Sequence, residues 1–254
     1  MTEATYVYCV VHGGKKALAR APKGLAGTGK PRVLPAGDDL ALVVATAPLP
    51  AYAAETIDAK LRDLDWVGAR AAEHEAVVEH AATLGTVVPM KLFTLFASDD
   101  RAVGHVTKIK KSLGRVIERI EGCEEWGLRI LLDETRAAKA AAAAARSVKP
   151  ASGKDFLLRK KALDTERREH GARGAAEAEA LYDRVAGFVR DHLKRSAPNR
   201  ELAGRVIVDA AFLVPHGAVE RLKETVAASA DALVAEGFDI SLTGPWPAYS
   251  FIDR

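Results

Sequence analysis

The sequence ends in a segment that can fold in very few ways. Residues 238–252 read as one β-strand, a Gly-Pro-Trp-Pro break and a second short strand. Gly244 can adopt a positive φ, whereas Pro245 and Pro247 each fix their own φ and remove a backbone donor. Trp246 is therefore held on a stiff arm between two apolar runs. Because chain ends usually fray unless something ties them down, we expect this tail to be docked on a folded domain.

Length and composition allow one large domain or two smaller ones. The 254 residues are 48% hydrophobic and 28% charged, as in an ordinary globular protein with a sizeable core. The formal net charge of +3 gives no electrostatic argument for nucleic acid. The two cysteines, Cys9 and Cys123, do not form a zinc-binding pattern with the histidines. No apolar run is long enough to cross a membrane and no signal peptide is recognisable, so we expect a cytoplasmic protein without a cofactor.

The first half of the chain predicts an α/β domain that ends near Gly122. A β-rich run at residues 6–11 opens it, and the apolar run at residues 40–45 reads as another strand. Between residues 103 and 120, apolar side chains recur every three or four positions, which predicts a helix. Gly122 breaks that pattern. We therefore assign residues 1–122 to an N-terminal α/β domain.

Residues 123–254 predict a second domain with a different layout. From Trp126 onward the expected order is strand, helix, strand, helix, strand, which is typical of a ferredoxin-like α+β domain with helices on one face of the sheet. We expect a long helix from Ser152 to Pro198 in this domain. Four residues near its end continue at helical spacing: Leu181, Val185, Phe188 and His192. The docked C-terminal tail is expected to close the sheet of this second domain.

One glycine-rich segment resembles a nucleotide-binding loop. Residues 24–30 match the pattern G-x-x-x-x-G-K, but a P-loop also needs a Ser or Thr after the Lys, an apolar strand before it and a helix after it. Pro31 follows Lys30 here, and the next segment is strand-like, so we reject ATP or GTP binding. From His12 to Arg32, with Arg32 included, there are still six Lys or Arg residues and no acid. An enzyme that binds an anionic small molecule through this basic Gly-rich loop is the alternative function.

Three other patterns that could indicate a metal, nucleic-acid or catalytic site do not meet the requirements of such sites. His74 and His80 lie six positions apart on an expected helix and point to different sides, whereas zinc-binding histidines on one helix sit at i and i+4. The basic residues between 159 and 168 are interleaved with acids and lack aromatic stacking platforms. No serine lies in a nucleophile elbow. The sequence therefore predicts no catalytic site, no metal site and no nucleic-acid partner.

Three separate patches resemble one known family. They are Tyr6-Val-Tyr-Cys-Val-Val near the start, Val88-Pro-Met-Lys-Leu-Phe-Thr-Leu-Phe96 in the middle, and Thr243-Gly-Pro-Trp-Pro-Ala-Tyr-Ser-Phe251 at the end. Trp66, the pair His74-Glu75 and the stretch that starts at Gly153-Lys-Asp-Phe add to the match. Together these patches resemble the GvpL/GvpF family of gas vesicle proteins over nearly the whole chain. The closing motif is the most specific of them.

This resemblance implies an accessory protein of gas vesicle assembly rather than an enzyme. It implies an α+β fold of two domains, an N-terminal α/β domain and a C-terminal modified ferredoxin-like domain. It also implies localisation at the gas vesicle in the cytoplasm. The implied partners are the small, very hydrophobic shell protein and other gas vesicle accessory proteins, which would be bound during nucleation or growth. No catalytic residues are implied.

A protein that keeps an aggregation-prone shell subunit soluble needs an apolar surface or a free sheet edge. Apolar side chains of the middle run and of the tail could supply or support such a surface. Ordinary packing in the core is the competing interpretation for all of them. The interaction candidates are Phe93, Leu95, Phe96, Trp246, Tyr249 and Phe251.

Overall fold

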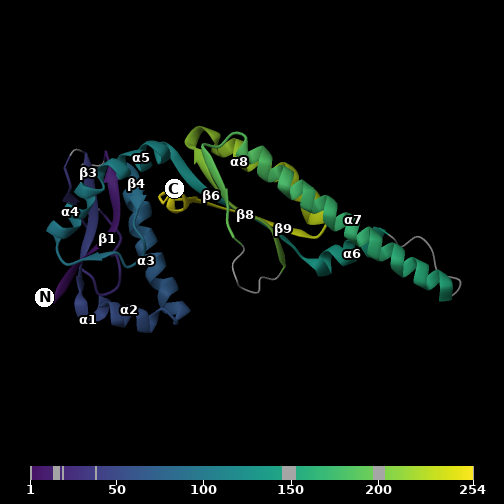
Figure 1. Ribbon diagram of the computed structural model, residues 1–254, viewed down its shortest axis with the longest axis horizontal. Coiled ribbons are helices and arrows are strands. Elements are labelled where there is room, and N and C mark those ends of the chain that lie inside the picture. Colours follow the sequence, from purple (N-terminus) through teal and green to yellow (C-terminus); the bar gives the residue numbers. More distant parts are fainter. Residues whose placement is uncertain are drawn as a thin grey trace. The chain divides into compact units, whose positions relative to one another are not determined.

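The structure is a computed structural model that describes residues 2–13, 18, 20–37, 39–144, 153–196 and 204–253 (Figure 1). The chain divides into two compact units. The first unit is Met1–Gly122 together with Trp246–Arg254, and the second unit is Cys123–Pro245. The tail that follows Pro245 therefore packs within the first unit, whereas the sequence placed it in the second domain. None of the described helices is long and apolar enough to cross a membrane.

The first unit is built around strand β1 (Glu3–His12), which is buried from Ala4 to Val11. Both faces of this strand are covered, which explains its nearly continuous apolar sequence. It pairs antiparallel with three other strands, and the sheet order is β2-β3-β1-β4 with β5 also on β1. The partners of β1 are β3 (Leu40–Pro48), β4 (Thr86–Pro89) and β5 (Leu95–Phe96), and β2 (Arg32–Pro35) pairs with β3.

Five helices accompany the described part of this sheet: α1 (Leu49–Tyr52), α2 (Ala54–Lys60), α3 (Leu64–Ala82), α4 (Asp99–Lys108) and α5 (Lys110–Ile120). Helix α3 begins where the Asp63 carboxylate accepts a hydrogen bond from the Trp66 amide. Its buried face, which includes Val77 and Val78, packs in one core with Tyr6 and Tyr8 of β1. The single helix expected across residues 103–120 is interrupted at Ile109, where ψ is 10°.

The second unit holds a four-stranded sheet with the order β7-β8-β6-β9. Its strands are β6 (Cys123–Leu132), β7 (Asp191–Lys194), β8 (Arg205–Pro215) and β9 (Phe238–Trp246). β8 runs antiparallel to both β6 and β7. The remaining elements are α6 (Glu134–Ala144), α7 (Gly153–Ala186), η1 (His216–Ala218) and α8 (Val219–Ala235).

One face of the second sheet packs against α7 and α8, which run along it (Figure 1). Alternate residues of β6, such as Leu128 and Ile130, join Leu181 of α7 and Leu222 of α8 in a single core. The intervening residues of β6 point to the opposite face. This alternation separates an apolar face from a polar one.

Two elements near the end of the chain differ from the sequence prediction. The long helix ends at Ala186, and His192 lies in strand β7 rather than in the helix. The helical spacing of apolar residues gave a wrong prediction here. The chain turns after Gly187, and residues 191–194 form their backbone hydrogen bonds with β8. The expected start at Ser152 lies outside the described residues. The second short strand of the tail is instead a 3₁₀ turn, η2 (Tyr249–Phe251).

Candidate functional site

Buried side chains and polar contacts hold the C-terminal tail on the first unit. Phe251 is fully buried. The Tyr249 hydroxyl donates a hydrogen bond of 2.6 Å to Glu75 Oε2 on α3. Arg119 Nη1 on α5 donates to the Phe251 carbonyl oxygen at 3.3 Å, and Lys91 forms an ion pair with Asp253 at 2.8 Å. The tail thus bridges α3, α5 and the segment after β4.

The backbone just before the tail requires glycine at position 244. This residue adopts a φ of +142° within strand β9. A Cβ atom there would lie 2.9 Å from the Glu125 carbonyl oxygen and 2.9 Å from Cδ2 of Trp126. Both the backbone conformation and the space therefore favour glycine.

In the first unit, a chain of buried and partly buried hydrogen bonds links β1, α3 and the segment before β5. The Phe93 amide donates to the Tyr6 hydroxyl at 3.2 Å, and that hydroxyl lies 2.7 Å from Nδ1 of His74. Because the hydroxyl accepts from Phe93, its own hydrogen is available for the His74 nitrogen. Burial lowers the pKa of His74 to about 4, so the imidazole is neutral at pH 7.

This hydrogen-bond chain also fixes Phe93, which has a positive φ of 65°. The Phe93 ring stacks on the Trp66 ring, with 5.4 Å between centroids and an interplanar angle of 15°. The positive charges of Lys60 and Arg70 lie over the face of the same Trp66 ring. Phe93 is thus ordered by both a hydrogen bond of its amide and stacking of its ring.

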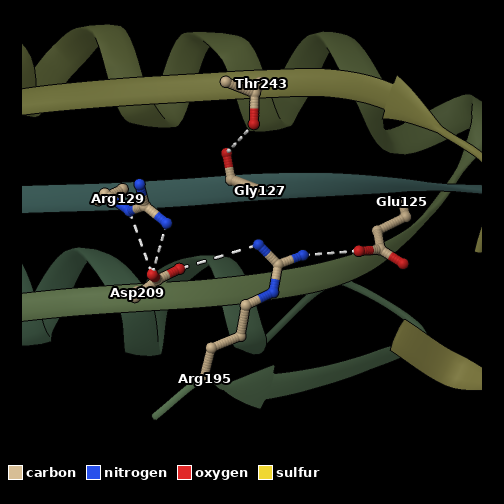
Figure 2. A network of polar contacts seen from close by, with 6 residues as sticks. All are labelled: Glu125, Gly127, Arg129, Arg195, Asp209 and Thr243. Atoms are coloured by element: carbon tan, nitrogen blue, oxygen red, sulfur yellow. Dashed lines mark hydrogen bonds and ion pairs between the residues drawn. The ribbon is translucent and has the colours of Figure 1, made fainter. Parts of the chain in front are cut away.

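The polar face of the second sheet carries a separate network of charges (Figure 2). Arg195 donates from Nη2 to Glu125 Oε1 at 2.7 Å, and its Nη1 lies 3.8 Å from Asp209 Oδ1. Arg129 donates twice to Asp209 Oδ2, from Nε at 3.1 Å and from Nη2 at 2.8 Å. The side chains of Glu125 and Asp209 are each only 4% exposed, so both carboxylates are buried beneath arginines that reach solvent.

A close approach between strands lies beside this network. Thr243 of β9 faces Gly127 of β6, as Figure 2 shows, and a Cβ on Gly127 would lie 2.9 Å from the Thr243 hydroxyl oxygen. Sequence inspection did not select any of the charged residues of this network. Their partners lie 70 and 80 positions apart, so only the strand pairing brings them together.

The six predicted interaction residues lie in different environments. Phe93 and Leu95 pack against the core of the first unit, and the Phe96 ring lies 5.2 Å from the His105 ring. Phe251 is buried, whereas Trp246 and Tyr249 are 41% and 36% exposed. The structure therefore places four of the six in packing contacts and leaves two with substantial exposed surface.

The described part of the basic Gly-rich loop uses its amides for internal contacts. The Leu25 amide donates to the Tyr8 hydroxyl at 3.0 Å, and the Ala26 amide donates to Glu73 Oε2 at 2.9 Å. An anion at these amides would compete with the carboxylate of Glu73. Residues 14–17 and 19 of the loop lie outside the described residues. Within the ranges that are described, no cluster of three His, Cys, Asp or Glu side chains could hold a metal ion.

Comparisons with known proteins agree over nearly the full length. Residues 4–253 match the family model described as gas vesicle synthesis protein GvpL/GvpF. Gas vesicle protein L from Streptomyces sp. (strain CB03234) is 29% identical over 253 residues, which cover 97% of this chain and 91% of that protein.

Two solved structures share the fold. The crystal structure of the gas vesicle protein GvpF from Anabaena sp. PCC7120 has a TM-score of 0.65 at 17% identity and covers 99% of this chain and 96% of its own. GvpF from Microcystis aeruginosa has a TM-score of 0.66 at 16% identity, with 98% of each chain covered. With the fold, the ordered middle run and the docked closing motif in place, the match over residues 4–253 shows that the chain belongs to the GvpL/GvpF family of gas vesicle synthesis proteins.

Proposed function

We propose that this protein is a non-enzymatic accessory factor of gas vesicle assembly that acts in the cytoplasm. In this role it binds the hydrophobic shell protein, together with other gas vesicle proteins, during nucleation or growth. Membership of a family of gas vesicle synthesis proteins supports the general role. The exposed Trp246 side chain, presented by a docked tail, is the observation that supports a binding surface.

Trp246 has the physical properties of a binding anchor. It is 41% exposed, and the prolines on either side restrict the backbone that carries it. Large aromatic side chains dominate the energy of many interfaces, and a pre-ordered backbone lowers the entropy lost on binding. Tyr249 exposes part of its ring while its hydroxyl is tied to Glu75. Phe251 serves as the buried anchor of the tail, and Phe93, Leu95 and Phe96 support the same unit from within.

We also propose that the two units are an α/β domain and a modified ferredoxin-like domain. The order of elements in the second unit supports this assignment, because two strand–helix–strand halves follow each other along the chain. The sheet order, with the first and third strands in the centre, is that of an antiparallel ferredoxin-like sheet. The divided helical segment, α6 and α7, is the modification.

Capture of the shell protein tests the proposed surface. Tagged protein would be co-expressed with the shell protein of the same gas vesicle, and the captured shell protein would be quantified. We expect Trp246→Ser to reduce capture by roughly tenfold or more, as for other aromatic anchors. Leu64→Ser is the matched control, because Leu64 is 64% exposed in the same unit and lies outside the tail. Equal capture by Trp246→Ser and the wild type would show that the tail is not part of the binding surface.

A further inference from the structure

The second unit contains a cavity of about 650 Å³, partly open to solvent, where α6 and α7 meet the ends of two central strands. Leu132 closes β6 at this point, and Arg205 opposite it begins β8. The helix walls are made of small residues, which leave the space unfilled: Ala137 on α6, and Gly171, Ala172 and Ala175 on α7. Its volume lies within the range of about 300–1,000 Å³ that is usual for small-molecule sites.

Close backbone contacts hold the walls of this cavity in place. Helix α6 is capped by Asp133, whose carboxylate accepts from the amides of Thr135 and Arg136. The Asp133 amide in turn donates to the Gly237 carbonyl at 3.0 Å. A Cβ on Gly174 of α7 would lie 2.1 Å from the Phe238 ring, which shows how tightly that helix is packed. These contacts fix the positions of α6 and α7 beside the sheet.

Two arginines from different elements line the cavity, Arg168 of α7 and Arg205 of β8. In the part of the chain that the structure describes, neither takes part in a hydrogen bond or an ion pair, unlike Arg129, Arg136 and Arg195. Among the described residues that line the cavity, Glu134 is the single acidic one, and it has another contact of its own. These described residues thus carry a net positive charge, and the guanidinium donors are available.

We propose that this cavity binds a small organic anion, in which a carboxylate or phosphate group is attached to an apolar body. The two guanidinium groups suit a planar carboxylate or a phosphate, which arginine can bind through paired hydrogen bonds. Leu132 and the alanines of the two helices contact the apolar body. This site belongs to the second unit, whereas Trp246 and the basic Gly-rich loop belong to the first.

Titrations followed by ¹H–¹⁵N NMR test this site directly. Hexanoate and hexyl phosphate supply the two anionic groups on one apolar body, inorganic phosphate supplies the anion alone, and hexanol supplies the body alone. We expect hexanoate or hexyl phosphate to shift the amide signals of Gly171, Ala172 and Ala175 in a saturable way. Hexanol is expected to give no saturable shift. Saturation by inorganic phosphate as strong as that by hexyl phosphate would overturn the role of the apolar body.

Variants assign the binding to the two arginines. We expect Arg168→Gln and Arg205→Gln each to weaken the binding by roughly tenfold, because a charge-assisted bond is lost. Arg173→Gln is the matched control, since Arg173 is exposed on the same helix and does not line the cavity. Unchanged spectra away from α6 and α7 would show that the variants are folded. The proposal would be overturned if neither hexanoate nor hexyl phosphate gave saturable shifts. It would also be overturned if the Arg168, Arg205 and Arg173 variants bound these anions equally well.

Discussion

Both units bury polar groups beside a sheet, but they keep them there by different means. In the first unit, His74 and Tyr6 are buried as neutral partners, because burial holds the imidazole uncharged. In the second unit, Glu125 and Asp209 are buried next to the cations of Arg129 and Arg195. The buried groups of the first unit carry no charge. Those of the second unit are charged, and neighbouring arginines neutralise them. The two units should therefore respond differently to pH and to loss of a cation.

Loss of one arginine is expected to have the largest effect. Arg195→Met leaves Glu125 without that cation and Asp209 with Arg129 alone, and breaking such a buried pair typically costs about 3 kcal/mol. Hydrogen exchange of the β6 and β8 amides would report the lowered free energy of unfolding of the second unit. Arg173→Met, on an exposed arginine, should change it by less than about 0.5 kcal/mol. Equal exchange in both variants would mean that water already compensates the carboxylates.

Acid is expected to act mainly on the first unit through His74. The pKa is about 4 in the folded protein and 6.5 in the unfolded chain, so between these values the unfolded state binds more protons. This contribution to stability is complete above pH 6.5 and falls by up to about 3 kcal/mol as the pH drops towards 4. Hydrogen exchange of the β1 amides at several pH values would measure it. His74→Gln should flatten the dependence and His80→Gln should not; an unchanged slope in His74→Gln would contradict this origin.

The Tyr249 hydroxyl is expected to contribute a smaller amount, and only to the stability of the docked tail. Tyr249→Phe removes the hydrogen bond to Glu75 and should ease opening of the tail by about 1 kcal/mol. The rate of proteolysis after residue 245 would measure that opening. Lys91→Met removes an exposed ion pair to Asp253 and should change the rate less, since exposed pairs contribute about 0–1 kcal/mol. A larger effect of the lysine variant would show that the ion pair, and not the hydroxyl, holds the tail.

The smallest effect on stability is expected for Trp246→Ser. Its side chain is 41% exposed, and surface substitutions usually change the free energy of unfolding by less than about 0.5 kcal/mol. Thermal unfolding of the wild type and the variant would be compared. Stability close to that of the wild type, together with lost shell-protein capture, would separate binding from folding. A large drop in the unfolding temperature would instead identify Trp246 as part of the packing.

The strands of both sheets were the most predictable part of the fold. Continuous apolar runs predicted β1 and β3, and the run that begins at Trp126 predicted most of β6, because such patterns reflect burial directly. The pattern failed at His192, where apolar spacing suited a helix but pairing with β8 determined the conformation. The spacing of apolar residues within one segment does not show that the segment will pair with a strand elsewhere in the chain, as residues 191–194 do with residues 210–213.

The candidate sites were less predictable than the strands. The stiffness of the tail follows from Gly244 and its prolines, but its docking on α3 and α5 depends on Glu75 and Arg119, which are distant in sequence. Cavities between helices are also invisible in a sequence, because small residues such as Gly171 and Ala175 do not reveal which element they face. Family resemblance identified the protein class, whereas contacts between distant residues were needed to find the charged network and the cavity.

The division of the chain has a consequence for the order in which the units form during synthesis. Every residue of the second unit precedes Trp246, whereas the first unit receives its last segment only after residue 245. The ribosome therefore supplies all of the second unit before it supplies the side chain of Phe251, which fills a buried position in the first. The first unit therefore starts before the second unit and receives its last described segment after it. Until then, Glu75 of α3 and Arg119 of α5 lack the hydrogen bonds that they form with the docked tail.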